Sequence, residues 1–374
     1  MNILVIGSSK RDFHVAFDAL VLGLAKIGVS LDHYPNILTQ SYGVTCTYGL
    51  NFETPNILYP EYSTILSNLK KKKYDLIITL TSRVNYKGGK HGIFSYMTRR
   101  FKYSLKSNKH KLGGGIVIDW IRAGVKLPPF IVIDDLDDPF IWPQDFELLT
   151  NCKLYFKCEL PFDRFLCFRL FSRTVIKHKE DRQRQFPVLT EKLRPLWSAY
   201  DKESIAKYTD INNIPNYADR DIDIILLFNP SSSYIRQKVL NLSDEITRKW
   251  KNVISIKTRG RLSRHEFFEI AKRSKIAISP GGARWDGPKH YEFMLCGILL
   301  FFICPTIELA YKLKDGENCV FVENDLKGLF EKLDYYLSNT TLSAEIAQKS
   351  YNLAKNTLGN DMLAKYVLNT YSKV

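Results

Sequence analysis

The sequence predicts an α/β protein made of two Rossmann-like domains that face each other across a cleft. The chain has 374 residues, 45% of them hydrophobic, so it is long enough to bury two cores. Short apolar runs of strand type alternate with amphipathic segments of helix type in both halves, which is typical of parallel sheets covered by helices. A stretch of weak periodicity with several prolines separates the halves. We therefore expect a first domain over residues 1–190, a linker over 191–221 and a second domain over 222–357.

The first half opens with an apolar strand over residues 1–7, the loop Gly7-Ser8-Ser9-Lys10 and a helix over residues 12–28. Strand, short loop and helix is a Rossmann-like opening, although the loop lacks the full dinucleotide fingerprint. Hydrophobic periodicity predicts one further helix and further strands in this half. The helix covers residues 62–72, and the strands cover 75–80, 112–118, 130–133 and 150–158.

The second half repeats the alternation of strands and helices from residue 223 onward. The predicted strands cover residues 224–228, 253–257, 276–279 and 298–304, and the predicted helices cover 234–251, 265–274 and a segment beginning at 288. A last amphipathic helix covers residues 362–371.

A glycine-rich turn precedes the helix that begins at Pro288 and stops at Gly297. Because Gly281 and Gly282 have no side chains, we expect their backbone N–H groups to receive an anion near the positive end of this helix. Glu292, at an expected exposed position one turn into the helix, can accept hydrogen bonds from vicinal hydroxyls. Ligands of open α/β sheets bind beyond the carboxyl ends of the strands. The turn therefore predicts a pocket for a phosphorylated sugar carrier, with an ordinary glycine loop beside a surface Glu as the alternative.

The region around this helix resembles a known family. The run YEFMLCGILLFF at 291–302, followed by DGENCVFVEND at 315–325, is similar to the carboxyl-terminal half of GT-B glycosyltransferases, nearest to the group 1, spore-coat-like and exostosin-like branches. The resemblance implies that Glu292 binds the ribose of a sugar nucleotide and that the first domain binds the acceptor. It also implies that a helix within residues 358–374 packs back on the first domain. Where many relatives carry a second Glu near the donor sugar, this chain has Arg284, which we include among the candidate donor-binding residues.

Basic residues near the glycine turn predict the counter-charge for a departing nucleoside diphosphate. Arg259 and Arg261 follow the predicted strand 253–257, and arginine can bind phosphate through two hydrogen bonds without losing its charge. Lys289 and His290, in the first turn of the helix, are candidates for the same task, with a partly buried structural histidine as the alternative for His290. Such cations would take the place of a metal. We therefore expect no metal or other cofactor, the nucleotide sugar being a substrate.

Acidic residues at predicted strand ends are candidates for the base that takes the proton of an acceptor hydroxyl. Asp119 and Asp134 each follow or end a predicted strand, and we expect His14 behind them. The acidic run 134–138 also allows a Mg²⁺ or Mn²⁺ site of the kind found in the other large glycosyltransferase fold. Helix capping and charge balance are the simpler interpretation of most of the run. The nucleotide features after residue 250 disfavour the metal site.

The net charge of +15 and the isoelectric point near 9.3 favour anionic partners. Basic clusters at residues 70–73, 99–111 and 164–184, the last two with interleaved aromatic residues, suit an anionic membrane surface or stacked single strands of nucleic acid. Solvated helix surfaces are the alternative. The sequence contains no RNP motif, zinc-finger spacing or heptad repeat, which disfavours a nucleic-acid partner.

The sequence also bears on the compartment. No apolar run reaches the length of a membrane-spanning helix, and the first ten residues read as a strand and not as a signal peptide. The seven cysteines lack CxxC spacing, which argues against a disulfide framework and a zinc site. We expect a cytoplasmic protein that associates peripherally with the inner face of a membrane.

The resemblance implies a metal-independent glycosyltransferase of hexosyltransferase type. Its donor would be a nucleotide sugar and its acceptor a glycan or a lipid-linked molecule in surface polysaccharide or glycoconjugate biosynthesis. Two alternatives stay open. A nucleotide-sugar isomerase or epimerase of the same fold would turn over the donor without an acceptor. A basic, non-catalytic protein would bind nucleic acid in a salt-dependent way.

Overall fold

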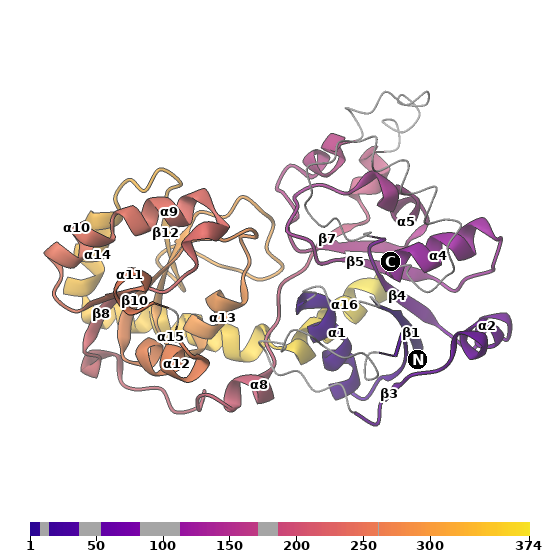
Figure 1. Cartoon of the computed structure of the whole chain (residues 1–374), viewed down its shortest axis with the longest axis horizontal. Coiled ribbons are helices and arrows are strands. Elements are labelled where there is room, and N and C mark those ends of the chain that lie inside the picture. The colour runs from indigo at the N-terminus through magenta and orange to yellow at the C-terminus, as the bar shows by residue number, and fades with distance from the viewer. Residues whose placement is uncertain (8–14, 37–53, 83–112, 171–185, 261) are drawn as a thin grey trace.

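The computed structural model describes residues 1–7, 15–36, 54–82, 113–170, 186–260 and 262–374. In these residues the chain forms two α/β domains, each built on a parallel sheet (Figure 1). The predicted fold class is thereby confirmed. In Figure 1 the first domain is the indigo and magenta half and the second is the orange half.

The first domain contains a seven-stranded parallel sheet in the order β3-β2-β1-β4-β5-β6-β7. Alternate residues of β1 enter two different cores, with Ile3 and Val5 on one face and Leu4 and Ile6 on the other. Strands buried on both faces read as unbroken apolar runs, which made most of them recognisable. The strands are β1 (Asn2–Ile6), β2 (Ser30–Tyr34), β3 (Ile57–Leu58), β4 (Leu76–Leu80), β5 (Phe130–Asp134), β6 (Leu154–Lys157) and β7 (Leu193–Pro195).

The helices of this domain are α1 (Val15–Lys26), α2 (Tyr62–Lys70), α4 (Gly113–Arg122) and α5 (Phe146–Asn151), with the short 3₁₀ turns η2 (Pro143–Asp145) and η3 (Arg164–Phe168). Most of α1 is buried, since it packs on the sheet with one face and on a later helix with another. The predicted linker begins too early, because β7 pairs with β6 and belongs to the first sheet.

The predicted strand over residues 112–118 is wrong, because residues from 113 onward form helix α4. The β-branched run Ile116 to Ile118 is typical of a strand, but Ile116, Val117 and Trp120 are buried on one side of a helix. Gly114 allows this helix to lie close to β4, since a Cβ there would come within 2.7 Å of the Leu80 carbonyl oxygen. Asp119 therefore lies inside a helix and not at the end of a strand.

The second domain contains a five-stranded parallel sheet in the order β12-β11-β10-β8-β9. Its central strands were predicted within a few residues. The predicted strand 253–257 is too long, since β9 ends at Ser255 and a short helix follows at once. The strands are β8 (Ile222–Leu226), β9 (Val253–Ser255), β10 (Ser274–Ser279), β11 (Leu299–Ile303) and β12 (Val320–Val322).

Helices cover both faces of the second sheet (Figure 1). The single helix predicted over residues 234–251 is two helices, with Leu242 between them. The helical elements of the linker and the second domain are α8 (Lys202–Ala206), η4 (Tyr217–Asp219), η5 (Pro230–Ser232), α9 (Tyr234–Asn241), α10 (Ser243–Lys249), α11 (Ile256–Arg259), α12 (Arg264–Lys272), α13 (Pro288–Leu295), α14 (Leu329–Ser338), α15 (Thr340–Thr357) and α16 (Asn360–Ser372).

The last helix, α16, leaves the second domain and lies against α1 of the first (Figure 1). The two helices approach closely at Gly23, where a Cβ would come within 1.9 Å of the Asn360 carbonyl oxygen. Leu363, Ala364 and Val367 of α16 belong to the same hydrophobic cluster as the inner face of α1. This cluster continues through the linker into the second domain, so the two domains share one core. None of the helices in the described residues has the length and apolar character needed to cross a bilayer.

Candidate functional site

The glycine turn, residues 280–287, connects β10 to α13 and is held in place by the start of α9. Ser233 donates its hydroxyl hydrogen to the Gly281 carbonyl oxygen at 2.8 Å, and the Arg236 guanidinium donates to the Pro280 carbonyl oxygen at 3.1 Å. Arg236 also donates to the Ser232 hydroxyl at 2.7 Å. The carboxyl ends of β8 and β10 thus present one connected surface beside the first turn of α13.

Gly282 has a different use from the one predicted. Its N–H donates to the Arg284 carbonyl oxygen at 2.9 Å, so this amide is engaged within the turn and does not point an unused donor at a phosphate. A Cβ on Gly282 would lie 3.0 Å from the Arg236 guanidinium. The absence of a side chain at Gly282 thus leaves room for the Arg236 guanidinium beside the turn.

Glu292 is buried, not exposed as expected, with 2% of its surface accessible. One carboxylate oxygen forms an ion pair with Arg264 of α12 at 2.9 Å, while Oε2 is buried without a hydrogen-bond partner. Glu292 and Arg264 line a small cavity at the junction with the linker and α1, beside Tyr200 and Ser204. An orphaned buried acceptor is costly unless a ligand or water satisfies it.

Two further cations lie near this ion pair: Lys289, which interacts with the charges of Glu292 and Arg264, and Arg236, which interacts with Lys289. Lys289 donates to the Leu227 carbonyl oxygen at 2.9 Å. Burial lowers the pKa of Lys289 to about 8, with Arg236 and Arg264 contributing in the same direction and Glu292 opposing them. We call Arg236, Arg264, Lys289 and Glu292 the cationic site. Three cations and one carboxylate suit a ligand that carries both negative charge and hydroxyl groups.

Two other predicted cations, His290 and Arg259, do not join this site. His290 is buried between the rings of Trp285 and Phe302, at centroid distances of 5.3 and 4.7 Å. Burial lowers the pKa of His290 to about 3, so the ring is neutral and cannot offset phosphate charge; this prediction is wrong. Arg259 is exposed at the end of α11, near Glu266 of α12. Arg261 lies outside the described residues.

Arg284 crosses to the first domain instead of facing the cationic site. Its guanidinium forms ion pairs with Asp135 at 2.7 Å and with Asp137 at 2.8 Å, and donates to the Ser198 hydroxyl at 3.0 Å. Its side chain is only 13% exposed and that of Asp135 is fully buried. These contacts use the groups that a sugar contact would need, so the donor-binding role predicted for Arg284 is not supported by this geometry.

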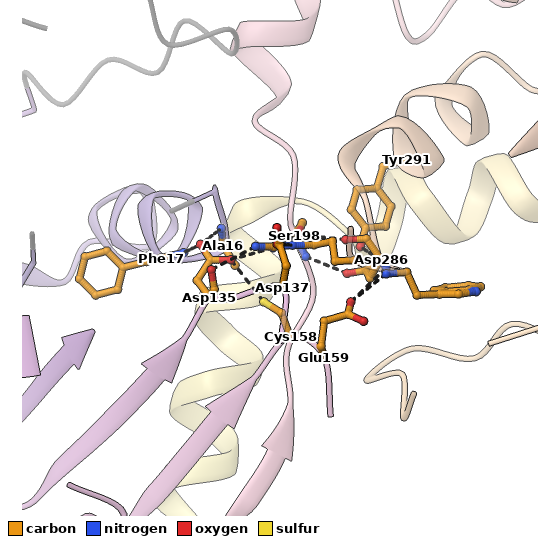
Figure 2. Close-up of polar contacts among 11 residues, drawn as sticks. Ala16, Phe17, Asp135, Asp137, Cys158, Glu159, Ser198, Asp286 and Tyr291 are labelled. Carbon is orange, nitrogen blue, oxygen red and sulfur yellow. Dashed lines mark hydrogen bonds and ion pairs between the residues drawn. The ribbon is translucent and has the colours of Figure 1, made fainter. Parts of the chain in front are cut away.

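Two more carboxylates connect the domains next to Arg284 (Figure 2). Glu159, which follows β6, accepts from the Trp285 backbone N–H at 3.0 Å and from that of Asp286 at 3.5 Å. Asp286 accepts from the Ser198 N–H at 3.0 Å and from the hydroxyls of Tyr291 and Tyr311. The last residues of the turn are thus bound to β6, the linker and α13 at once.

Glu159 is expected to lower the stability of the folded protein as the pH rises from 4.5 to about 7. Burial raises the pKa of Glu159 from 4.5 to about 7, with Asp286 adding to the effect while the Trp285 and Asp286 amides and Arg284 oppose it. Between these pH values the folded protein holds a proton that the unfolded chain releases, so stability is lost on the way up to pH 7. Glu159→Gln should therefore raise the melting temperature by a few degrees at pH 8, corresponding to about 2 kcal/mol, and change it little near pH 4.5.

Melting curves at both pH values would check this, with Glu331→Gln, an exposed position on α14, as the matched control. Equal shifts of the Glu159→Gln variant at both pH values would contradict the expectation.

Asp134, the predicted base, is directed into the first domain and not toward the cleft. Its Oδ2 pairs with Lys157 at 2.9 Å and accepts from the Tyr155 hydroxyl at 3.0 Å, and both charged side chains are at most 1% exposed. A carboxylate enclosed in this way cannot reach an acceptor hydroxyl, so the prediction is wrong for Asp134. It is also wrong for the strand-end position of Asp119, which lies in α4. His14 lies outside the described residues.

The acidic run 134–138 is occupied by protein partners. Asp134 binds Lys157, Asp135 and Asp137 bind Arg284, and Asp138 accepts from the Trp142 indole N–H at 2.9 Å. In the part of the chain that the structure describes, no group of three or more His, Cys, Asp and Glu side chains is arranged to hold a metal ion.

Arg236 and Arg264 were missed in the sequence. Each lies in the first turn of a helix, α9 and α12, where the helix dipole favours anions and a cation is unfavourable. The available signal was a basic residue in the first turn of a helix. Without the structure, nothing indicated that Arg264 pairs with Glu292 or that Arg236 binds the glycine turn.

Comparison with known proteins gives a match of one segment to a family and a likeness in fold. Residues 233–363 match the glycosyl transferase-like family. No curated protein sequence matches the chain. Three solved structures are similar over nearly the full length, and all are 12% or 13% identical in sequence, which limits the likeness to the fold.

Two of these structures are of HepE from Anabaena. In complex with UDP it aligns with a TM-score of 0.51 and 13% identity, and in complex with UDP-glucose with a TM-score of 0.50 and 12% identity, covering 100% of both chains each time. The third is a glycosyltransferase from Rickettsia africae, with a TM-score of 0.51 and 12% identity over 100% of this chain and 98% of that one.

Proposed function

We propose that this chain is a glycosyltransferase that transfers a sugar from a nucleoside-diphosphate donor bound at the cationic site. The GT-B fold and the match of residues 233–363 to the glycosyl transferase-like family support this activity. The acceptor is a hydroxyl group of a glycan or of a lipid-linked molecule, bound by the first domain. The observation that carries the proposal is the buried Oε2 of Glu292, which lacks a partner within a site of three cations.

Each part of the cationic site has a task in this proposal. The ribose hydroxyls donate to Glu292, and Arg264 holds its carboxylate in position. Arg236 and Lys289, beside the glycine turn and the first turn of α13, offset the charge that develops on the departing diphosphate. Such fixed cations supply the counter-charge that a metal ion supplies in other enzymes, so transfer is proposed to be metal-independent. HepE, the structural neighbour from Anabaena, has been solved with UDP and with UDP-glucose, which supports a uridine nucleotide as the first probe.

The proton of the acceptor hydroxyl needs a base in the first domain. We retain His14 for this task, since it directly precedes α1 in the chain and the enclosed Asp134 cannot perform it. The remaining step is a displacement in which the acceptor oxygen bonds to the anomeric carbon, the bond to the diphosphate breaks, and the proton passes to the base.

A membrane-linked acceptor is consistent with the surface of the first domain. Phe162, Phe165 and Leu166 are 62%, 54% and 46% exposed, in a chain with a net charge of +15. Exposed aromatic residues and positive charge together favour peripheral binding to anionic lipid. In the described residues Phe168 is buried and cannot contribute to this surface. Co-sedimentation with phosphatidylglycerol vesicles, compared with phosphatidylcholine vesicles, tests this binding to anionic lipid.

The proposed function is tested by thermal shift with a panel of nucleoside diphosphates and nucleotide sugars, followed by turnover assays with and without EDTA. A ligand at 100 times its Kd stabilises the folded protein by about 2.7 kcal/mol, and turnover should be unchanged by EDTA. Donor consumption that needs no acceptor and yields an isomer would instead identify a sugar-nucleotide isomerase. If only single-stranded nucleic acid shifted the melting temperature, the proposal would be wrong.

A further inference from the structure

A short chain of contacts leads from the glycine turn to the start of helix α1 (Figure 2). The Arg284 carbonyl oxygen accepts from the Gly282 amide, and the Arg284 guanidinium binds Asp135 Oδ1 at 2.7 Å. The other oxygen, Asp135 Oδ2, accepts from the backbone N–H groups of Ala16 at 2.8 Å and Phe17 at 3.3 Å. Asp135 therefore holds the amino end of α1 with one oxygen and the glycine turn with the other.

The ion pair between Arg284 and Asp135 has a tightly constrained geometry. Both side chains are almost entirely buried, and charge-assisted hydrogen bonds are stronger and more directional away from water. The guanidinium also donates to the Ser198 hydroxyl of the linker at 3.0 Å and to the Asp135 carbonyl oxygen at 3.1 Å. The planar fork of an arginine can make these bonds together, whereas a lysine ammonium on a flexible stem cannot reproduce them.

The middle and the end of α1 are also held in place by contacts. Its middle packs against α16, where Gly23 meets Asn360 and Ala364. Its last residue, Lys26, forms ion pairs with Asp201 and Glu203 of the linker. Because α1 is held at both ends and along its length, we expect a change at Arg284 to alter the position of the whole helix relative to the glycine turn.

We infer that Arg284 and Asp135 are a positioning pair for sugar transfer, which hold the start of α1 and the glycine turn at one fixed separation without touching the substrates. The inference rests on the proposed function, in which the donor lies at the glycine turn and the acceptor in the first domain. The reacting oxygen and carbon must approach to about 3–3.5 Å, and an error of about 1 Å in placement can lower the rate about 100-fold. The donor-sugar contact that the family resemblance implied for position 284 is replaced by this role.

The test compares Arg284→Lys and Asp135→Asn with the control Arg273→Lys. Arg273 pairs with Asp221 inside the second domain, and both side chains are more than half exposed. Asparagine at 135 can still accept from the α1 amides, and lysine at 284 keeps the charge, so both variants are expected to fold. We expect kcat to fall at least tenfold in each, Kd for UDP to change by less than threefold, and the control to match the wild type. Hydrogen exchange at the amides of residues 16 and 17 should accelerate in Arg284→Lys.

Unchanged kcat together with unchanged amide exchange would overturn the inference. A Kd for UDP that rises in parallel with the loss of kcat would also overturn it, because Arg284 would then contact the donor. The hydrogen-exchange measurement needs no substrate. It therefore tests the positioning role of Arg284 and Asp135 separately from the proposed glycosyltransferase function. If the wild type bound no nucleotide, the proposed function would fail, while faster exchange in Arg284→Lys would still support the connection between the turn and α1.

Discussion

Replacement of Glu292 by glutamine is expected to weaken UDP binding about 10- to 100-fold. In the proposed site the Glu292 carboxylate accepts from the ribose hydroxyls, and hydrogen bonds to a charged group contribute about 1.5–3 kcal/mol. Glutamine keeps the volume of the side chain but loses the charge and replaces one acceptor oxygen with an NH₂ donor. Isothermal titration with UDP would measure the change, and kcat/KM for the donor should fall by a similar factor.

The effect on folding should be smaller. Arg264 is 27% exposed and lies over the rings of Tyr208, Phe267 and Phe268, so loss of its ion pair is expected to cost about 1 kcal/mol. Glu269→Gln on the same helix α12, where the side chain is exposed, is the matched control and should bind UDP like the wild type. Undiminished binding by Glu292→Gln would remove Glu292 from the site and with it the main support for the proposed function.

Replacement of Lys157 by methionine is expected to destabilise the protein by about 3–5 kcal/mol. Lys157 is fully buried and its ammonium pairs with Asp134, whose Oδ1 has no partner even in the native protein. Removal of one member of a buried pair leaves a charge that neither water nor protein compensates. Denaturation by urea, followed by tryptophan fluorescence, would report the change in the free energy of unfolding of the first domain.

Two comparisons separate burial from charge in this experiment. Lys249→Met removes an ion pair with Asp334 in which both partners are more than 40% exposed, and it should cost at most about 1 kcal/mol. The double variant Lys157→Met with Asp134→Leu removes both charges and should recover most of the loss. A Lys157→Met protein as stable as the Lys249→Met control would show that the pair does not support the fold.

The sequence predicts the fold well where one local signal suffices. The helix that contains Glu292 was found because Pro288 and Gly297 mark its ends, and both observed bounds agree closely with them. Buried strands such as β4 and β5 were found from unbroken apolar runs. The same signal failed for α4, whose β-branched residues resemble a strand and whose helical packing depends on distant contacts with β4 and α5.

The site was predictable only in part, because the role of each acidic residue depends on the direction in which its side chain points. Asp134 and Asp135 are adjacent, yet one turns inward to Lys157 and the other toward Arg284 and α1. Successive residues of a strand point to opposite faces, but only the structure shows which face meets the other domain. The burial of Glu292 was missed for a similar reason, since its partner Arg264 comes from another helix.

The packing of α16 on α1 has a consequence for synthesis in the cell. A chain leaves the ribosome amino end first, and domains generally fold as they emerge. Here the surface of α1 that includes Gly23 is covered by residues 360–367, near the end of the chain. The apolar face of α1 therefore stays uncovered until residues 360–367 have been synthesised, which makes chaperone dependence greatest for nascent chains that have not yet reached α16.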